Sequence, residues 1–144
     1  MTHRRIADII ADQTPLTAPG STTVADAARL MKRHTIGAVI VVDDGKLAGI
    51  FTERDALFRV VAESRDPAAT RISDVMTARP QTITPDRPIG HALLLMYEGG
   101  FRHVPVVENG KLIGMVSARD ALGPELQAFE SELVHRDHIR EILA

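Results

Sequence analysis

Two stretches of the 144-residue chain decide the fold, because the second repeats the first. Residues 39–55 read VIVVDDGKLAGIFTERD, and residues 104–120 read VPVVENGKLIGMVSARD. Matching positions lie 65 residues apart, and this register holds without a gap from Pro15 to Leu57 and over the corresponding second stretch. Self-similarity at a fixed period indicates that one structural unit is used more than once. The sequence therefore predicts a duplicated unit of roughly 60 residues.

Each copy carries the same pattern of secondary structure. Apolar residues recur at helical spacing over residues 24–31 and 89–96, and a β-branched run follows each helix. The dipeptides Asp44-Gly45 and Asn109-Gly110 are strong signals for a two-residue hairpin turn, because both turn residues must adopt positive φ. We therefore expect each unit to run helix, strand, tight turn, strand, helix, after a short extended piece. The expected strands are residues 39–42, 47–51, 104–107 and 112–116.

The size of the unit predicts how the two copies are organised. A unit of this length is marginal alone, since it buries only about 60% of its chain surface. We expect two α/β units, residues 6–66 and 71–125, to pack sheet against sheet with pseudo-two-fold symmetry as one compact module. Two equivalent clefts would lie between them. Residues 126–144 form a tail that is expected to be helical, and its apolar residues pack either on the same chain or on a second copy. We expect a homodimer.

Composition excludes several classes of partner. The chain has 17 Lys and Arg against 19 Asp and Glu, a net charge of −2, whereas a nucleic-acid binder carries a basic stripe. Its five aromatic residues are few for stacking on bases. The longest apolar run, residues 36–42, is far shorter than the ~20 residues of a membrane span. The chain has no Cys, which favours an intracellular setting. We expect a cytoplasmic protein with no membrane or nucleic-acid partner.

The sequence also lacks the usual signatures of catalysis. It contains no recognisable nucleophile motif, Gly-rich phosphate loop or pair of catalytic carboxylates, so we expect neither enzyme activity nor a catalytic cofactor. His135 and His138 lie three residues apart in the tail, where a metal pair is the alternative to a solvated helix face. Asp43-Asp44 fits a hairpin turn better than a pair of metal ligands. We predict no metal site.

The candidate chemistry lies where each hairpin ends. In both copies a hydroxyl residue opens a helix, an Arg follows two residues later, and an Asp three residues later. These residues are Thr52, Arg54 and Asp55 in the first copy and Ser117, Arg119 and Asp120 in the second. One interpretation is a helix cap, in which the hydroxyl and the carboxylate bind backbone N–H groups. The other is a nucleotide site, in which the helix N-terminus and the Arg attract phosphate and the Asp accepts hydrogen bonds from a ribose diol. The two interpretations do not exclude each other.

The duplicated pattern resembles a pair of cystathionine β-synthase (CBS) domains, a module that binds adenosine ligands. The resemblance covers roughly residues 6–125. It rests on the segments ISDVMT (72–77), FRHVPVV (101–107), GKLIG (110–114) and SARD (117–120), while the counterparts within residues 36–55 match more loosely. The resemblance implies an α/β fold of two β-α-β-β-α units. It also implies a stand-alone, non-catalytic sensor of AMP, ADP, ATP or NAD, with S-adenosylmethionine a weaker candidate.

The resemblance assigns the ribose end of the ligand. By analogy with the family, Asp55 and Asp120 would hold the ribose diol. Thr52 and Ser117 would lie near the phosphate or the ribose.

The resemblance also assigns the adenine and phosphate ends. The backbone at Thr17 and Thr82 would contact the adenine edge, and Arg102 and His103 would reach the phosphate. The first copy has Gly37-Ala38 at the positions of Arg102 and His103, so the two clefts are predicted to differ in affinity or ligand. The alternatives are a surface ion pair for Arg102 and a hydrogen-bonded strand histidine for His103. The alternative function is a structural or protein-interaction dimer module with vestigial clefts.

Overall fold

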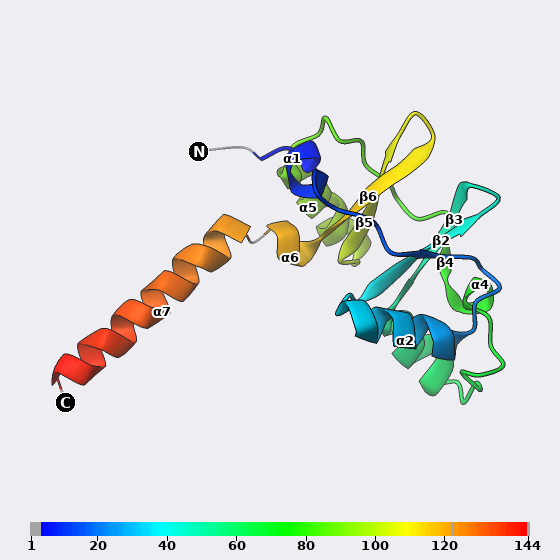
Figure 1. The fold of residues 1–144 in the computed structure, drawn as a ribbon, viewed down its shortest axis with the longest axis horizontal. Coiled ribbons are helices and arrows are strands. Elements are labelled where there is room, and N and C mark those ends of the chain that lie inside the picture. Colours follow the sequence, from blue (N-terminus) through cyan, green and yellow to red (C-terminus); the bar gives the residue numbers. More distant parts are fainter. Residues whose placement is uncertain (1–3, 122, 144) are drawn as a thin grey trace.

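The computed structural model describes residues 4–121 and 123–143 and shows two α/β halves followed by a long helix (Figure 1). The predicted fold class and the two repeated units are confirmed. The elements in chain order are α1 (Ile6–Ile10), β1 (Thr17–Ala18), α2 (Val24–His34), β2 (Ala38–Asp43), β3 (Lys46–Thr52), α3 (Glu53–Asp55), the π-helical turn η1 (Ala56–Val61), α4 (Ile72–Val75), β4 (Thr77–Ala78), α5 (Ile89–Gly99), β5 (His103–Glu108), β6 (Lys111–Ser117), α6 (Ala118–Ala121) and α7 (Gly123–Leu143).

The two hairpins are built alike, as the repeat predicts. Strands β2 and β3 pair antiparallel from Ala38 opposite Thr52, and β5 and β6 pair antiparallel from His103 opposite Ser117. Both turn dipeptides adopt positive φ, with 52° and 74° in the first and 52° and 78° in the second. This confirms the predicted turns, whose twist matches that of the flanking strands. The register of both hairpins shifts at the same place, before the second residue of the Val-Val pair.

The segments that precede the two halves are exchanged between them. Ile6 and Ile10 of α1 are buried in the core of the second half, whereas Ile72 and Val75 of α4 are buried in the core of the first. Strand β4 continues this exchange, because it pairs antiparallel with β3. At the matching place in the second half, Gln13 Oε1 accepts a hydrogen bond of 2.6 Å from the Met115 N–H. The exchange interlocks the halves, and neither core is complete without a segment from outside its own repeat.

A third cluster of buried side chains joins the two hairpins directly. Ala38, Ile40 and Ile50 from the first hairpin pack together with Met115 from the second. This cluster is the interface that the sequence predicts between the two sheets. It also fixes the ends of β3 and β6 relative to each other, and these ends carry Thr52 and Ser117.

Helix α7 extends away from the rest of the molecule (Figure 1). All side chains from residue 131 to residue 143 are exposed. The expectation that the tail packs on its own chain is therefore wrong for this stretch. Exposed apolar residues on it include Leu133, Val134 and Ile142. Within residues 4–121 and 123–143, no helix combines the length and the hydropathy of a membrane span.

Gly49→Ala is expected to destabilise the protein by about 1–3 kcal/mol, because it forces extra volume into a packed contact. A Cβ at position 49 would lie 2.7 Å from the Thr77 carbonyl oxygen, which is backbone of the paired strand β4. The free energy of unfolding, measured with urea, checks this. Gly90→Ala is the matched control, since a Cβ there meets nothing within 4 Å and alanine favours the α5 helix. Equal stability of the two variants would contradict the tight β3–β4 contact.

Candidate functional site

Both junctions between the second hairpin strand and the following helix are capped in the same way. The Thr52 N–H and hydroxyl donate to Asp55 Oδ2 at 2.9 and 3.1 Å. The Ser117 N–H and hydroxyl donate to Asp120 Oδ2 at 2.8 and 3.0 Å. In each case the Asp N–H donates back to the hydroxyl oxygen at 3.3 Å. The cap interpretation is therefore confirmed at both places, and it fixes both carboxylates through one oxygen.

Asp55 differs from Asp120 because an arginine engages its other oxygen. Arg59 Nε lies 3.6 Å from Asp55 Oδ1, and Asp55 is only 8% exposed, whereas Asp120 is half-buried. Arg59 Nη1 also donates to the carbonyls of Val75 and Met76 at 3.1 and 2.8 Å. Arg59 lies on η1, the kind of π-helical turn that often marks functional sites. The position 65 residues later is Pro124, so the second half has no equivalent arginine.

A cavity of about 760 Å³ lies beside Asp55, and we call it the first cavity. This volume falls within the range of small-molecule sites. It is bordered by α3 and η1 of the first half, by residues 77–81, and by residues 99–103 of the second half. Arg54 bridges this cavity, since its Nη1 donates to the Gly100 carbonyl at 3.1 Å. The charged side chains of its lining are Glu53, Arg54, Asp55, Arg59, Arg79 and Arg102.

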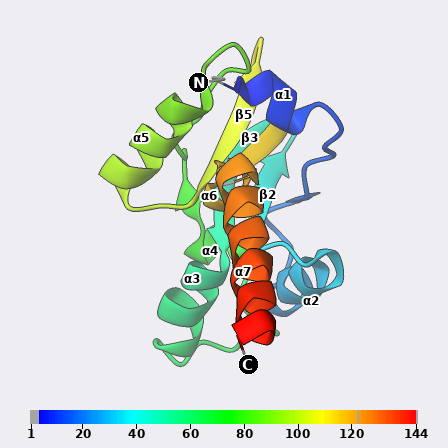
Figure 2. The ribbon, with the colours of Figure 1, turned by 90° about the vertical axis from the view of Figure 1, so that its left-hand side faces the viewer.

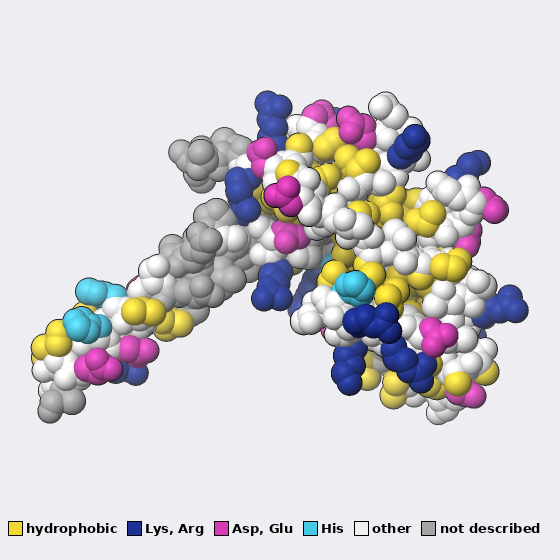
Figure 3. Space-filling model, viewed as in Figure 1, with side chains coloured by type: hydrophobic (Ala, Val, Ile, Leu, Met, Phe, Trp, Pro, Cys, Tyr) yellow, Lys and Arg dark blue, Asp and Glu magenta, His cyan; other side chains and the backbone are white. Residues whose placement is uncertain are grey.

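A cavity of about 1110 Å³ lies beside Asp120, and we call it the second cavity. Its lining includes the C-terminal part of α2, residues 35–37 ahead of β2, residues 117–120, and Gln13. Basic side chains gather over α2 in Figure 3. The last turn of α2 carries Lys32, Arg33 and His34, and Lys32 lines this cavity. The charged side chains of its lining are Lys32, Glu53, Arg102, Arg119 and Asp120.

The two cavities share one wall, which we call the shared wall and which consists of Glu53, Arg102 and His103. All three residues line both cavities. Glu53 lies against Gly37, because a Cβ at Gly37 would come within 2.8 Å of Glu53 Oε1. The sequence predicts Arg102 and His103 as phosphate contacts without assigning them to a cleft, and the structure places both at the boundary.

His103 lies among charged groups within this wall. Burial lowers the pKa of its imidazole below the usual 6.5, and the neighbouring Arg102 acts in the same direction. The carboxylates of Glu53 and Asp120 oppose this shift and raise the pKa. Burial dominates, so His103 is neutral at pH 7 when no ligand is present.

His103 is expected to make the protein less stable as the pH falls below about 6.5, the usual histidine pKa. The folded pKa is lowered, so the unfolded chain binds more protons in this range and acid favours unfolding. His103→Gln should therefore lose less stability than the wild type between about pH 7.5 and pH 5.5, as measured by urea unfolding. His34→Gln, on an exposed side chain of α2, is the control. An identical pH dependence in His103→Gln and the wild type would contradict the lowered pKa.

The structure brings most of the predicted site residues together. The first cavity contains Thr52, Arg54, Asp55, Arg102 and His103. The second contains Gly37, Arg102, His103, Ser117, Arg119 and Asp120.

Three of the predicted site residues lie outside both lining sets. Ala38 is fully buried in the cluster between the hairpins. Thr17 and Thr82 are exposed, and Thr17 belongs to β1, which pairs with β2. The segments that approach the cavities are residues 77–81 and Gln13, because they cross to the opposite hairpin.

Sequence reasoning missed four charged lining residues, which are Lys32, Glu53, Arg59 and Arg79. A comparison of the two copies could have revealed Glu53, which corresponds to Ala118, and Arg59, which corresponds to Pro124. Nothing in the sequence pattern marks Arg79. Across the residues that the structure describes, no group of three or more His, Asp or Glu side chains could hold a metal ion. The absence of a metal stays a prediction.

Comparison with known proteins decides the family. A model of the CBS domain matches residues 6–62 and again residues 72–123. The chain belongs to the CBS domain family. A curated relative of this CBS pair is the mitochondrial CBS domain-containing protein CBSX3 of Arabidopsis thaliana, which is 37% identical over 116 residues. The match covers 77% of this chain and 56% of the plant protein, so the chain spans about half the length of this relative.

Solved CBS structures share the fold. A putative signal-transduction protein with CBS domains from Burkholderia ambifaria is 36% identical with a TM-score of 0.82, over 86% of this chain and 95% of that one. The CBS domain protein PAE2072 from Pyrobaculum aerophilum, complexed with AMP, is 25% identical with a TM-score of 0.74, over 81% and 89% of the two chains. The CBS domain pair of protein MJ0100, in complex with 5′-methylthioadenosine and S-adenosyl-L-methionine, is 26% identical with a TM-score of 0.76, over 91% and 99%.

Proposed function

We propose that this CBS pair is a non-catalytic regulatory protein that binds adenine nucleotides in the two cavities between its halves. The observation that carries the proposal is the same in both cavities. An Asp carboxylate, fixed by its capping box, lies in a cavity of ligand size together with arginine side chains. A diol acceptor beside cationic donors suits a ribose that carries a phosphate.

The lining supports an orientation for the nucleotide. The caps use Oδ2 of each Asp, so Oδ1 is the oxygen that would accept from the ribose hydroxyls, and at Asp55 a ribose would share Oδ1 with Arg59. In the first cavity, Ile50, Phe58 and Phe101 provide an apolar surface for the adenine. Arg102 and His103 would lie toward the phosphate. The AMP complex of the Pyrobaculum relative and the two adenosine ligands of protein MJ0100 support an adenosine ligand of this kind. ADP, ATP and NAD share the same adenosine moiety.

We further propose that the regulatory state is a homodimer. Apolar side chains are exposed on α5 and on η1. Figure 2 shows α5 on the same side of the molecule as α3, which η1 directly follows. The exposed side chains are Leu93, Leu94 and Tyr97 on α5 and Leu57, Phe58 and Val61 on η1. AMP would shift the balance between monomer and dimer only if it binds the two states with different affinities. Light scattering with and without AMP measures the resulting change in average mass.

The names of the relatives support a role without catalysis, since they are called CBS domain-containing or signal-transduction proteins. A cytoplasmic location stays a prediction, and the Arabidopsis relative is named as mitochondrial.

A thermal-shift series with AMP, ATP, NAD and S-adenosylmethionine tests the proposed function. A ligand at about 100 times its dissociation constant stabilises the folded state by about 2.7 kcal/mol, which raises the melting temperature. We expect a rise with at least one of the four ligands. A structural or interaction module with vestigial clefts predicts no rise with any of them, and that result would overturn the proposal.

A further inference from the structure

The junction between α6 and α7 lacks one helical hydrogen-bond donor, and the Asp120 carbonyl is the group affected. In an unbroken α-helix this carbonyl would accept from the backbone N–H of the residue four positions later. That residue is Pro124, and proline has no backbone N–H. The Asp120 carbonyl instead accepts from Arg4 Nη2 at 2.9 Å. A side chain from the start of the described chain therefore supplies a donor that the proline does not.

The position of Arg4 is fixed by the second half. Its carbonyl accepts the Ile89 N–H at 2.9 Å, at the start of α5. Two residues later, the Ile6 N–H donates to the Arg87 carbonyl at 2.9 Å, and the Ile6 side chain is fully buried in the second core. The guanidinium also lies against the first residue of α7, because a Cβ at Gly123 would come within 3.1 Å of Arg4 Nη1. Arg4 therefore contacts both α6 and α7 from a backbone that α5 holds.

The matching place in the first half is built differently. The sequences of α1 and α4 align at an offset of 66 residues, which pairs Arg4 with Thr70. The backbone contact repeats, because the Thr70 carbonyl accepts the Val24 N–H at 2.8 Å. The side chain does not repeat, since threonine is much shorter than arginine. The first half has Arg59 at the position that corresponds to Pro124, and Arg59 keeps its backbone N–H. The long arginine thus belongs to the half whose helix junction contains the proline.

We propose that Arg4 is a positioning residue that couples Asp120, and with it a nucleotide in the second cavity, to the direction of α7. This inference rests on the proposed function. The Asp120 carboxylate is held by the Ser117 N–H, and its backbone carbonyl is held by Arg4. A ribose on Oδ1 and the start of α7 therefore bear on the same residue and the same guanidinium. Coupling of this kind is reciprocal, so a direction of α7 that AMP favours strengthens AMP binding by the same factor.

Calorimetric titration of the full chain with AMP tests the positioning of Asp120. Arg4→Ala should weaken AMP binding in the second cavity by about 3- to 10-fold, the usual effect of losing one hydrogen bond. The second cavity is identified as the site that Asp120→Ala weakens. Arg4→Lys keeps a charged donor and should recover part of the affinity. Gly123→Ala places a Cβ against the guanidinium and should cause a smaller loss than Arg4→Ala.

Two variants are matched controls for these substitutions. Arg5→Ala removes the same charge from an exposed side chain on the same segment and should leave AMP binding unchanged. Gly90→Ala adds a Cβ near the start of α5, where it meets nothing within 4 Å, and should also leave AMP binding unchanged.

Spin labels test the coupling to α7 by a measurement that a simple loss of stability would not change. The chain has no Cys of its own, so Glu141→Cys on α7 and Arg65→Cys in the first half take the labels specifically, and both positions are exposed. Double electron–electron resonance, with the labelled protein diluted into unlabelled protein, measures the distance between them. We expect Arg4→Ala to broaden the distance distribution. We expect AMP to change the distribution in the protein that keeps Arg4, and to change it less in Arg4→Ala.

The outcomes separate this inference from the function on which it rests. Equal AMP affinity in Arg4→Ala and the wild type would overturn the inference and leave nucleotide binding intact. A distance distribution that neither Arg4→Ala nor AMP changes would do the same. Equal losses of affinity in Arg4→Ala and Arg5→Ala would also overturn it, because the positive charge alone would then explain the effect. If AMP does not bind the wild type at all, the proposed function fails, and the inference fails with it.

Discussion

Asp120→Ala is expected to weaken AMP binding in the second cavity by about 10- to 150-fold, equivalent to roughly 1.5–3 kcal/mol. The reason is that the variant removes the charged acceptor that we assign to the ribose diol. Asp120 lies in the second cavity, and its capping box holds it in place through Oδ2. Calorimetry with AMP measures the loss directly.

The cap itself requires a control, because Asp120 also accepts the Ser117 N–H. Asp120→Asn keeps a carbonyl acceptor for the cap and loses the charge, so its AMP affinity should lie between those of the wild type and Asp120→Ala. Asp137→Ala removes a carboxylate from the exposed face of α7, where Asp137 Oδ1 is 3.9 Å from Arg140 Nη1, and should leave AMP binding unchanged. Unchanged AMP affinity in a folded Asp120→Ala protein would refute the ribose assignment.

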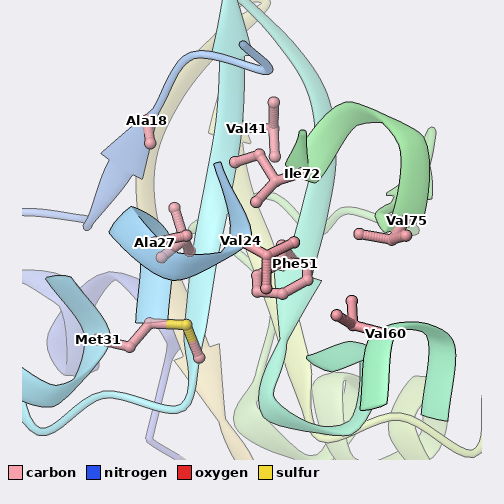
Figure 4. Close-up of a cluster of buried hydrophobic side chains, with 10 residues drawn as sticks. Ala18, Val24, Ala27, Met31, Val41, Phe51, Val60, Ile72 and Val75 are labelled. Carbon is pink, nitrogen blue, oxygen red and sulfur yellow. The ribbon is translucent and has the colours of Figure 1, made fainter. Parts of the chain in front are cut away.

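Phe51→Ala is expected to reduce the free energy of unfolding by about 3–5 kcal/mol, the usual cost of removing a buried aromatic ring. The Phe51 side chain is fully buried in the core of the first half, where it lies among Val24, Val60 and Ile72 (Figure 4). Ile72 belongs to α4, the segment exchanged from outside the first repeat. The lost contacts therefore weaken both the first half and its connection to the second.

Urea unfolding of Phe51→Ala measures this loss, and Phe58→Ala is its comparison. Phe58 is 57% exposed on η1, so its removal should change the stability by less than about 1 kcal/mol. A similar small change for both variants would contradict the packing of the first core.

Much of the local structure could be predicted from the sequence, because the signals for it are local. Asp44-Gly45 and Asn109-Gly110 specify their turns through their own backbone preferences. Thr23 caps α2 through an equally local contact, because its side chain accepts the Asp26 N–H at 3.2 Å. The capping boxes at Asp55 and Asp120 likewise follow from residues three positions apart.

The exchange between the halves could not be predicted in the same way. Ile72 and Ile6 have the apolar character of core residues, but nothing in their spacing states which core they enter. The adenine contact of Thr17 and Thr82 was implied by the family resemblance and stays a prediction, while residues 77–81 and Gln13 line the cavities. The hydrogen bonds from Arg59 to the Val75 and Met76 carbonyls could not be predicted either, because they depend on where tertiary packing places α4.

A crystal structure of the full chain grown with saturating AMP tests the central claim most directly. We predict nucleotide density between the two halves, with the ribose hydroxyls within hydrogen-bond distance of Asp120 Oδ1 and the phosphate against Arg102. Empty cavities at saturating AMP, or a nucleotide bound elsewhere on the chain, would contradict the account.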